Sequence, residues 1–236
     1  VTLVPLITLS CIGQNDLGKL NDMERISLVA WVPQQIESMP NAARSVLQNK
    51  LTQIVTQNGF GSTSLDNRFI LTTNITVLTK DITPTTPPMH AYTLEATLYI
   101  GDGLDGTLFS TTSITLKGVG ETEQKAYMAA LKGLRAKDER YREFLEVGKK
   151  KIIEYYNTRC DILIREAQAL ADQNKLEEAI AKLVAVPNVC MECFNKANDA
   201  IKPIYKRYID RDCSIKLQEA TALWNSGQDM NTARDI

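Results

Sequence analysis

The sequence predicts an α+β protein, in which a mixed or antiparallel sheet covered by two helices precedes an all-α region of helical repeats. Long stretches of alternating apolar and polar residues occur only in the first half of the chain. From about residue 135 onward, apolar residues recur at helical spacing and one helical segment occurs twice. We therefore expect an α+β domain over residues 1–135 and a helical-repeat domain over residues 136–236, with the polypeptide continuing past Ile236.

Composition and charge exclude several classes of protein. Hydrophobic residues make up 44% of the 236 residues and charged residues 23%, which is ordinary for a soluble globular protein. The net charge of -1 leaves no basic excess, so we expect no contact with nucleic acid. The chain has no run of eighteen or more apolar residues, and we expect no transmembrane segment.

The first quarter of the chain predicts two strands and a helix. Residues 3–9 and 25–33 are rich in Val, Ile and Leu, which favours strands. Residues 42–59 carry apolar side chains at helical spacing, and Gly59 fits a helix C-cap because glycine takes the left-handed conformation at little cost.

Three further strands and a helix are predicted up to residue 134. Residues 68–83 and 91–102 alternate, and their buried sides are expected to carry Leu71 and Leu98 among others. "GDGLDG" predicts a hairpin turn before the return strand over residues 107–118. Gly118-Val-Gly120 is expected to break that strand as a turn, and the helix that follows carries carboxylates near its positive end.

The remainder of the chain predicts only helices. One helix is interrupted briefly at "DQNK" and ends at Pro187. Another begins at Cys190, with Pro203 as a possible kink.

One segment of this helical half occurs twice. Residues 159–170 ("RCDILIREAQAL") match residues 212–223 ("DCSIKLQEATAL") at an offset of 53. Downstream, Ala179 matches Ala233 with one added residue. Recurrence of this kind is typical of stacked helical pairs. The identical pairs are Cys160 and Cys213, Ile162 and Ile215, Glu166 and Glu219, Ala167 and Ala220, Ala169 and Ala222, Leu170 and Leu223, and upstream Tyr155 and Tyr208.

The stretch "AQALADQNKLEEAIAKL" resembles the tetratricopeptide family, because Ala167, Leu170, Ala179 and Leu183 lie where that family has its packing residues. The repeat period is longer than the family norm, and the conserved proline comes early, as Pro187. The resemblance implies that the helices stack on neighbours and bind protein partners.

The order of elements in the first half, ending in "KGVGETEQKAYMAAL", resembles small ring-forming α+β domains of bacterial envelope assemblies. "STTSITLKGVGETEQKAY", "KKKIIEYY" and the cysteine-bearing helices also resemble a protein type found in Bacteroidetes and in their crAss-like phages. The second resemblance implies a virion ring or tail component, and neither resemblance assigns site residues.

The cysteines of the helical half are the candidates for chemistry. Cys190 and Cys193 form a Cys-x-x-Cys at the start of a helix, whereas a thioredoxin-type site would follow a strand. A tetrathiolate zinc site, a disulfide between helices in an oxidising compartment, and buried packing thiols all stay open. The residues concerned are Cys160, Cys190, Cys193 and Cys213.

No other constellation predicts catalysis or a cofactor. His90, assigned to the Pro-rich loop, has no nucleophile partner in a recognisable motif. Asp102 and Asp105 fit a turn better than a calcium loop, because the later bidentate acid is missing. We expect no enzyme, no metal and no cofactor.

The predicted function is therefore a structural subunit of a homo-oligomeric ring, with the helical repeats as a docking surface. A phage collar or tail ring component located in the virion is the preferred form. The alternative is a secreted or lipid-anchored bacterial envelope protein, in the periplasm or on the outer membrane, acting as a protein-binding module. "VTLVPLITLSC" invites Cys11 as an acylated residue, although Pro5 and the absence of basic residues favour a strand there.

Overall fold

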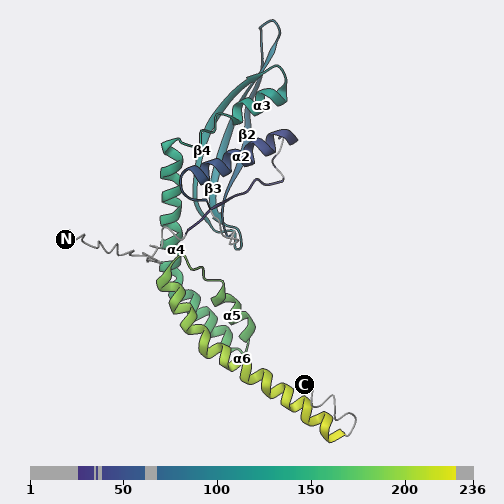
Figure 1. The fold of residues 1–236 in the computed structure, drawn as a ribbon, viewed down its shortest axis with the longest axis vertical. Coiled ribbons are helices and arrows are strands. Elements are labelled where there is room, and N and C mark those ends of the chain that lie inside the picture. Colours follow the sequence, from purple (N-terminus) through teal and green to yellow (C-terminus); the bar gives the residue numbers. More distant parts are fainter. Residues whose placement is uncertain (1–25, 35, 37–38, 62–67, 227–236) are drawn as a thin grey trace, which may run out of the picture.

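The computed structural model describes the chain except for residues 1–25, 35, 37–38, 62–67 and 227–236. The described part is elongated, with a sheet and its covering helices at one end and a bundle of helices at the other (Figure 1). The elements are β1 (Val29–Ala30), α2 (Asn41–Gln57), β2 (Phe69–Thr83), β3 (Met89–Asp102), β4 (Leu108–Gly120), α3 (Glu123–Leu131), α4 (Glu139–Asp172), α5 (Leu176–Val184) and α6 (Met191–Ser226). The predicted α+β class is confirmed.

The sheet is mixed, as predicted, and its strand order follows the chain, β1-β2-β3-β4. β1 pairs in parallel with β2, and the other neighbours are antiparallel. A register shift between Val77 and Thr79 marks an irregularity in β2. Strand β1 is shorter than predicted, and the strand predicted over residues 3–9 lies outside the described residues.

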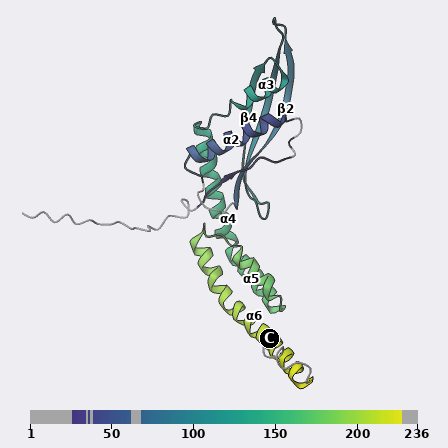
Figure 2. The same cartoon turned by 45° about the vertical axis from the view of Figure 1, so that its right-hand side comes forward.

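One face of the sheet forms the core, and α2, α3 and the first part of α4 cover it (Figure 2). Alternation places Leu71, Leu94 and Leu98 on this face, where each is fully buried. The opposite face carries Thr and Ser at many positions and is partly or fully exposed along β4. The predicted assignment of the two faces is therefore confirmed.

Gly118 and Gly120 belong to strand β4, so the prediction that they form a turn is wrong. A Cβ atom at Gly118 would lie 2.1 Å from the backbone nitrogen of Ala130, and one at Gly120 would lie 2.5 Å from that of Ala126. Helix α3 therefore rests directly on the backbone of β4 at a distance that only glycine permits. Thr122 caps this helix by accepting a hydrogen bond from the Lys125 amide at 3.2 Å.

Helix α4 has 34 residues and contacts both ends of the molecule. Asp138 caps its N-terminus by accepting from the Arg140 amide. Its first half packs on the sheet, where a Cβ atom at Gly148 would lie 2.3 Å from Ile100 Cδ1. Its second half packs against α5 and α6. At a rise of 1.5 Å per residue the helix is about 51 Å long, enough to join the two parts as one rod.

The helical end consists of α5 and α6 packed on the second half of α4, and we call these three segments the arm. Asn174 takes a positive φ of 62° in the turn between α4 and α5. Pro203 lies inside α6, which continues through it to Ser226. In the part of the chain that the structure describes, no helix is long and apolar enough to cross a membrane.

His90 is the second residue of β3 and pairs with Gly120 of β4, so its assignment to the loop is wrong. The antiparallel pairing of β2 with β3 begins directly after the Pro-rich segment, and it draws His90 into the sheet.

Candidate functional site

The junction between the sheet and the arm holds a buried ion pair between Arg68 and Asp102. Asp102 lies at the end of β3 and its side chain is 0% exposed, while the Arg68 side chain is 11% exposed. Arg68 Nε donates to Asp102 Oδ2 at 2.7 Å. A buried carboxylate requires a cation and hydrogen bonds, and this pair supplies both.

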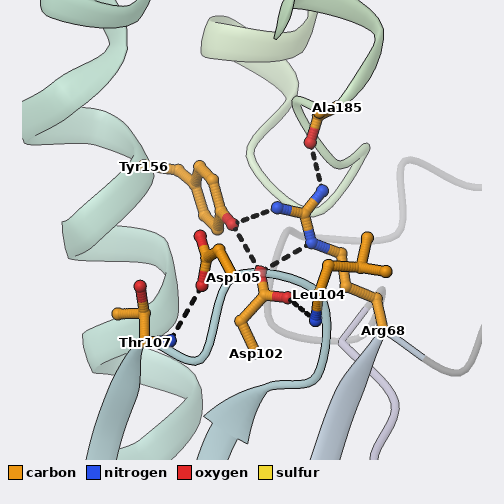
Figure 3. A network of polar contacts seen from close by, with 7 residues as sticks. All are labelled: Arg68, Asp102, Leu104, Asp105, Thr107, Tyr156 and Ala185. Atoms are coloured by element: carbon orange, nitrogen blue, oxygen red, sulfur yellow. Dashed lines mark hydrogen bonds and ion pairs between the residues drawn. The ribbon is translucent and has the colours of Figure 1, made fainter. Parts of the chain in front are cut away.

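Tyr156 of α4 completes the pair (Figure 3). Its hydroxyl donates to Asp102 Oδ2 at 2.9 Å and accepts from Arg68 Nη2 at 2.6 Å. The Arg68 guanidinium also lies over the Tyr156 ring, 5.4 Å from its centroid. Sheet and helix thus share one polar network inside an aromatic environment.

The same network reaches the arm through Arg68 Nη1, which donates to the carbonyl oxygen of Ala185 after α5. Asp102 Oδ1 accepts from the Leu104 amide at 2.9 Å, which shapes the β3–β4 turn. In that turn, Asp105 Oδ1 accepts from the Thr107 amide at 2.8 Å. One arginine therefore ties three segments together: the β3–β4 turn, α4 and the end of α5.

Burial raises the pKa of the Tyr156 phenol well above its usual range, and the Asp102 carboxylate raises it further against the opposing effect of Arg68. The phenol stays protonated at any physiological pH and serves as a hydrogen-bond donor. Arg68, Asp102 and Tyr156 are hydrogen-bonded to one another, so the arrangement favours a structural role over a reactive one.

The cysteines lie at different places in the arm. Cys160 of α4 and Cys193 of α6 form a disulfide with Cα atoms 5.5 Å apart, and both residues are buried. Cys190 is buried beside them, with its Sγ 2.7 Å from Asn157 Oδ1. Cys213 is exposed on α6 and takes no part in a disulfide. Cys11 lies outside the described residues.

A zinc site is not assembled by the described residues, which contain no group of three or more His, Cys, Asp or Glu placed to hold a metal ion. The two cysteines of the Cys-x-x-Cys contact different residues of α4. Cys193 is bonded to Cys160, and Cys190 contacts Asn157.

Shallow hollows occur on the surface of the described residues. One of about 240 Å³ lies between β1 and α2 and is lined by Ala30, Gln48 and Thr52 among others. Another, of about 310 Å³, lies between β4 and the start of α4, beside Ser110 and Arg140. Neither contains a set of convergent ionisable groups of the kind that active sites use.

The junction network could not be predicted from the sequence. Asp102 was recognised only as a turn residue, and Arg68 and Tyr156 belong to no motif. These two residues are 88 positions apart in the chain. The available signal was an arginine at the first position of a predicted apolar strand, which indicates a cation next to a buried segment.

No family model matches the chain, and no curated protein matches it in sequence. Several solved structures resemble it, among them the following three. A minor lipoprotein of Acinetobacter baumannii is 16% identical with a TM-score of 0.36, covering 52% of this chain and 94% of its own. A candidate lipoprotein of Caulobacter crescentus CB15 is 9% identical with a TM-score of 0.29, covering 56% and 86%. A Xanthomonas campestris protein of the DUF330 family is 11% identical with a TM-score of 0.31, covering 57% and 87%.

These neighbours are bacterial proteins, two of them described as lipoproteins, and none of the three is a phage protein. They contradict the prediction of a phage collar or tail ring component in the virion, which is therefore wrong. Because every TM-score is below 0.5, the likeness carries no argument about the activity, partners or attachment of this chain.

Proposed function

We propose that the chain is a non-enzymatic protein of the bacterial cell envelope that acts as a protein-binding module through its helical arm. The observation that carries the proposal is the disulfide between Cys160 and Cys193. Structural disulfides persist in oxidising compartments such as the periplasm, whereas cytosolic thiols are kept reduced.

The disulfide supports a structural role because of where it lies. It joins α4 to α6 inside the arm, with Cys160 3% exposed and Cys193 1% exposed. A buried bond of this kind is poorly accessible to a reducing partner, unlike the exposed, reactive cysteines of redox enzymes. Together with the Arg68–Asp102–Tyr156 network, it stabilises the arm and its attachment to the sheet.

The arm supports the binding role. Its helices carry the internal repeat, and the interpretation as a tetratricopeptide-like unit implies a surface that packs on another helix. The second occurrence of the repeat lies on α6, where Leu217 is 69% exposed and Trp224, seven residues on and therefore on the same face, is 60% exposed. Apolar side chains exposed together in this way are typical of a protein-binding surface.

The proposal is tested by the redox state of Cys160 and Cys193 in the cells that make the protein. Cells are quenched with acid, free thiols are alkylated, and peptides are analysed by mass spectrometry without reduction. We expect the Cys160–Cys193 peptide pair to be recovered intact and the protein to fractionate with the envelope. Alkylation of both residues in freshly quenched cells would overturn the envelope assignment.

The lipid-anchored form of this proposal depends on Cys11. An apolar run of residues 1–9 leads to this cysteine, as in the segment that precedes an acylated cysteine. Metabolic labelling with a radioactive fatty acid would show incorporation into the natural protein and none into a Cys11→Ser variant. Equal labelling of both would exclude Cys11 as the anchor.

A further inference from the structure

The far half of α6 exposes a continuous apolar stripe. Its members are separated by intervals of three or four residues, so they share one face of the helix. Leu217 is 69% exposed and Trp224 is 60% exposed, while the residues that α6 buries against α4 and α5, such as Ile204, occur earlier in the helix. The stripe consists of Tyr205, Ile209, Cys213, Leu217, Ala220 and Trp224.

The internal repeat relates this stripe to a covered face of α4. At the offset of 53 residues, its members correspond to residues of α4 that are already in contact with a neighbour. Cys160, the counterpart of Cys213, is bonded to another helix through its disulfide. On α4 this face is therefore covered along its length, by the sheet at Tyr156 and by α6 at Cys160, to which it is covalently linked. Ile164, the counterpart of Leu217, is partly buried, and the other five counterparts are buried: Ile152, Tyr156, Cys160, Ala167 and Ala171.

We propose that the stripe is covered by the same stripe of a second copy of this chain, with the two α6 helices antiparallel and a disulfide between their Cys213 residues. In a twofold-symmetric pair, only a residue at the axis meets its own copy. Cys213 lies near the middle of the stripe, which runs from Tyr205 to Trp224. The stripe therefore carries its thiol where an antiparallel pair requires it.

The chemistry on either side of Cys213 is complementary to itself. In the antiparallel arrangement, residues equally far before and after Cys213 face each other, so Ile209 meets Leu217 of the second copy. By the same rule, Lys202 meets Trp224 of the second copy, and an ammonium group is attracted to an indole face. Lys206 also lies on this face, and its counterpart is the small Ala220, which leaves room for the long side chain.

The inference rests on the proposed function, because the covalent step needs an oxidising compartment. The two Cys213 thiols lose two protons and two electrons, and one S–S bond forms between them. The electrons reduce the disulfide of a thiol–disulfide oxidoreductase, which leaves as a dithiol. Within the described residues no other thiol competes, since Cys160 and Cys193 are bonded and Cys190 is buried.

The covalent bond has a clear physical purpose. Six side chains from each copy give a contact toward the lower end of the ~1,200–2,000 Å² that specific interfaces bury. Such a contact alone holds two copies together weakly. Once a disulfide joins the two Cys213 residues, packing of the two stripes becomes intramolecular and independent of protein concentration.

The test exports the full chain to the periplasm and examines it without reduction by gel electrophoresis, sedimentation and mass spectrometry. We expect a covalent dimer carrying a Cys213–Cys213 peptide pair, and loss of more than nine-tenths of it in Cys213→Ser. A matched control moves the thiol by one residue, in Cys213→Ser with Ser214→Cys, where the exposed thiol points off the stripe. This control should form less than a tenth of the covalent dimer.

Packing and orientation are tested separately from the thiol. Leu217→Lys should lower the covalent dimer fraction several-fold, whereas Gln218→Lys, at an exposed position off the stripe, should leave it unchanged. In the Cys213→Ser background, Ile209→Cys alone should not cross-link, and Ile209→Cys together with Leu217→Cys should. Cross-linking by Ile209→Cys alone would indicate parallel helices and overturn the arrangement.

Other occupants of the stripe give recognisable results that overturn the proposal. A Cys213–Cys11 peptide pair, or a monomer whose Cys213 is protected from alkylation, would show that another segment of the same chain covers the stripe. Co-purification of a different protein linked through Cys213 would assign the stripe to that partner. Failure of the envelope proposal is distinguishable, because it is read from Cys160 and Cys193 in the native host and not from Cys213.

Discussion

Replacing Asp102 by alanine is expected to lower the free energy of unfolding by about 3–5 kcal/mol. The side chain is fully buried and accepts three hydrogen bonds, from Arg68 Nε, the Tyr156 hydroxyl and the Leu104 amide. Its removal leaves the Arg68 guanidinium, 11% exposed, without a counter-ion. Because Arg68 keeps this small contact with solvent, we expect a value near the lower end of the range.

The measurement is equilibrium unfolding in urea, followed by circular dichroism, for the wild type and for a set of matched variants. Asp102→Asn retains an acceptor for the Leu104 amide and should lose less than Asp102→Ala. Arg68→Met combined with Asp102→Ala should be less destabilised than Asp102→Ala alone, since no unpaired charge stays buried. Glu121→Ala removes an acid from an exposed ion pair and should leave the stability nearly unchanged.

The reasoning would be refuted by a loss of less than about 1 kcal/mol in Asp102→Ala, with an unchanged dependence on urea. That result would mean that the junction behaves as an exposed ion pair, open to water. If Arg68→Met with Asp102→Ala were as unstable as Asp102→Ala alone, the unpaired arginine would not be the source of the lost stability.

Three further perturbations probe other contacts. Gly118→Ala places a Cβ atom 2.1 Å from the Ala130 backbone nitrogen, and we expect a loss of about 1–3 kcal/mol or more in urea unfolding; a change below 0.5 kcal/mol would contradict the close packing of α3. Replacing Cys160 and Cys193 together by serine opens a link across a sequence separation of 33 and should cost roughly 3–4 kcal/mol, checked by calorimetry against the oxidised wild type. Asp138 has a pKa lowered to about 2 from 3.8, mainly because the neighbouring arginine side chain donates to it, so its stabilisation is present above about pH 4 and disappears as the pH falls toward 2. The difference in melting temperature between wild type and Asp138→Asn should therefore shrink between pH 5 and pH 2, and a constant difference would contradict this.

Much of the fold could be read from periodicity. The strand pattern around Leu71 and Leu98 identified both the strands and their buried face, because alternate residues of a strand point to opposite sides. The helices, and the break between α4 and α5, followed from apolar spacing. The turn predicted at Gly118 and Gly120 was wrong. A glycine that lets a helix pack closely on a strand cannot be told from a turn glycine by sequence alone.

The candidate sites were predicted less completely. Cys160, Cys190, Cys193 and Cys213 were singled out, but zinc, disulfide and packing all stayed open, since the choice depends on distances between helices. The structure pairs Cys160 with Cys193 and leaves Cys213 exposed. The contact between Arg68 and Asp102 was not predicted, because the two residues are distant in the chain and neither belongs to a motif.

The sequence by itself determined the α+β class, the order of the elements and the repeat that relates α4 to α6, because these depend on local periodicity. Only the tertiary structure decided which cysteines meet, which glycines admit α3 and which charges are buried at the junction. Those properties depend on contacts between residues far apart in the chain, such as the 5.5 Å between the Cα atoms of Cys160 and Cys193. The inference about the stripe around Cys213 needed both, since the repeat relates it to a covered face of α4 and the structure shows that on α6 the face is exposed.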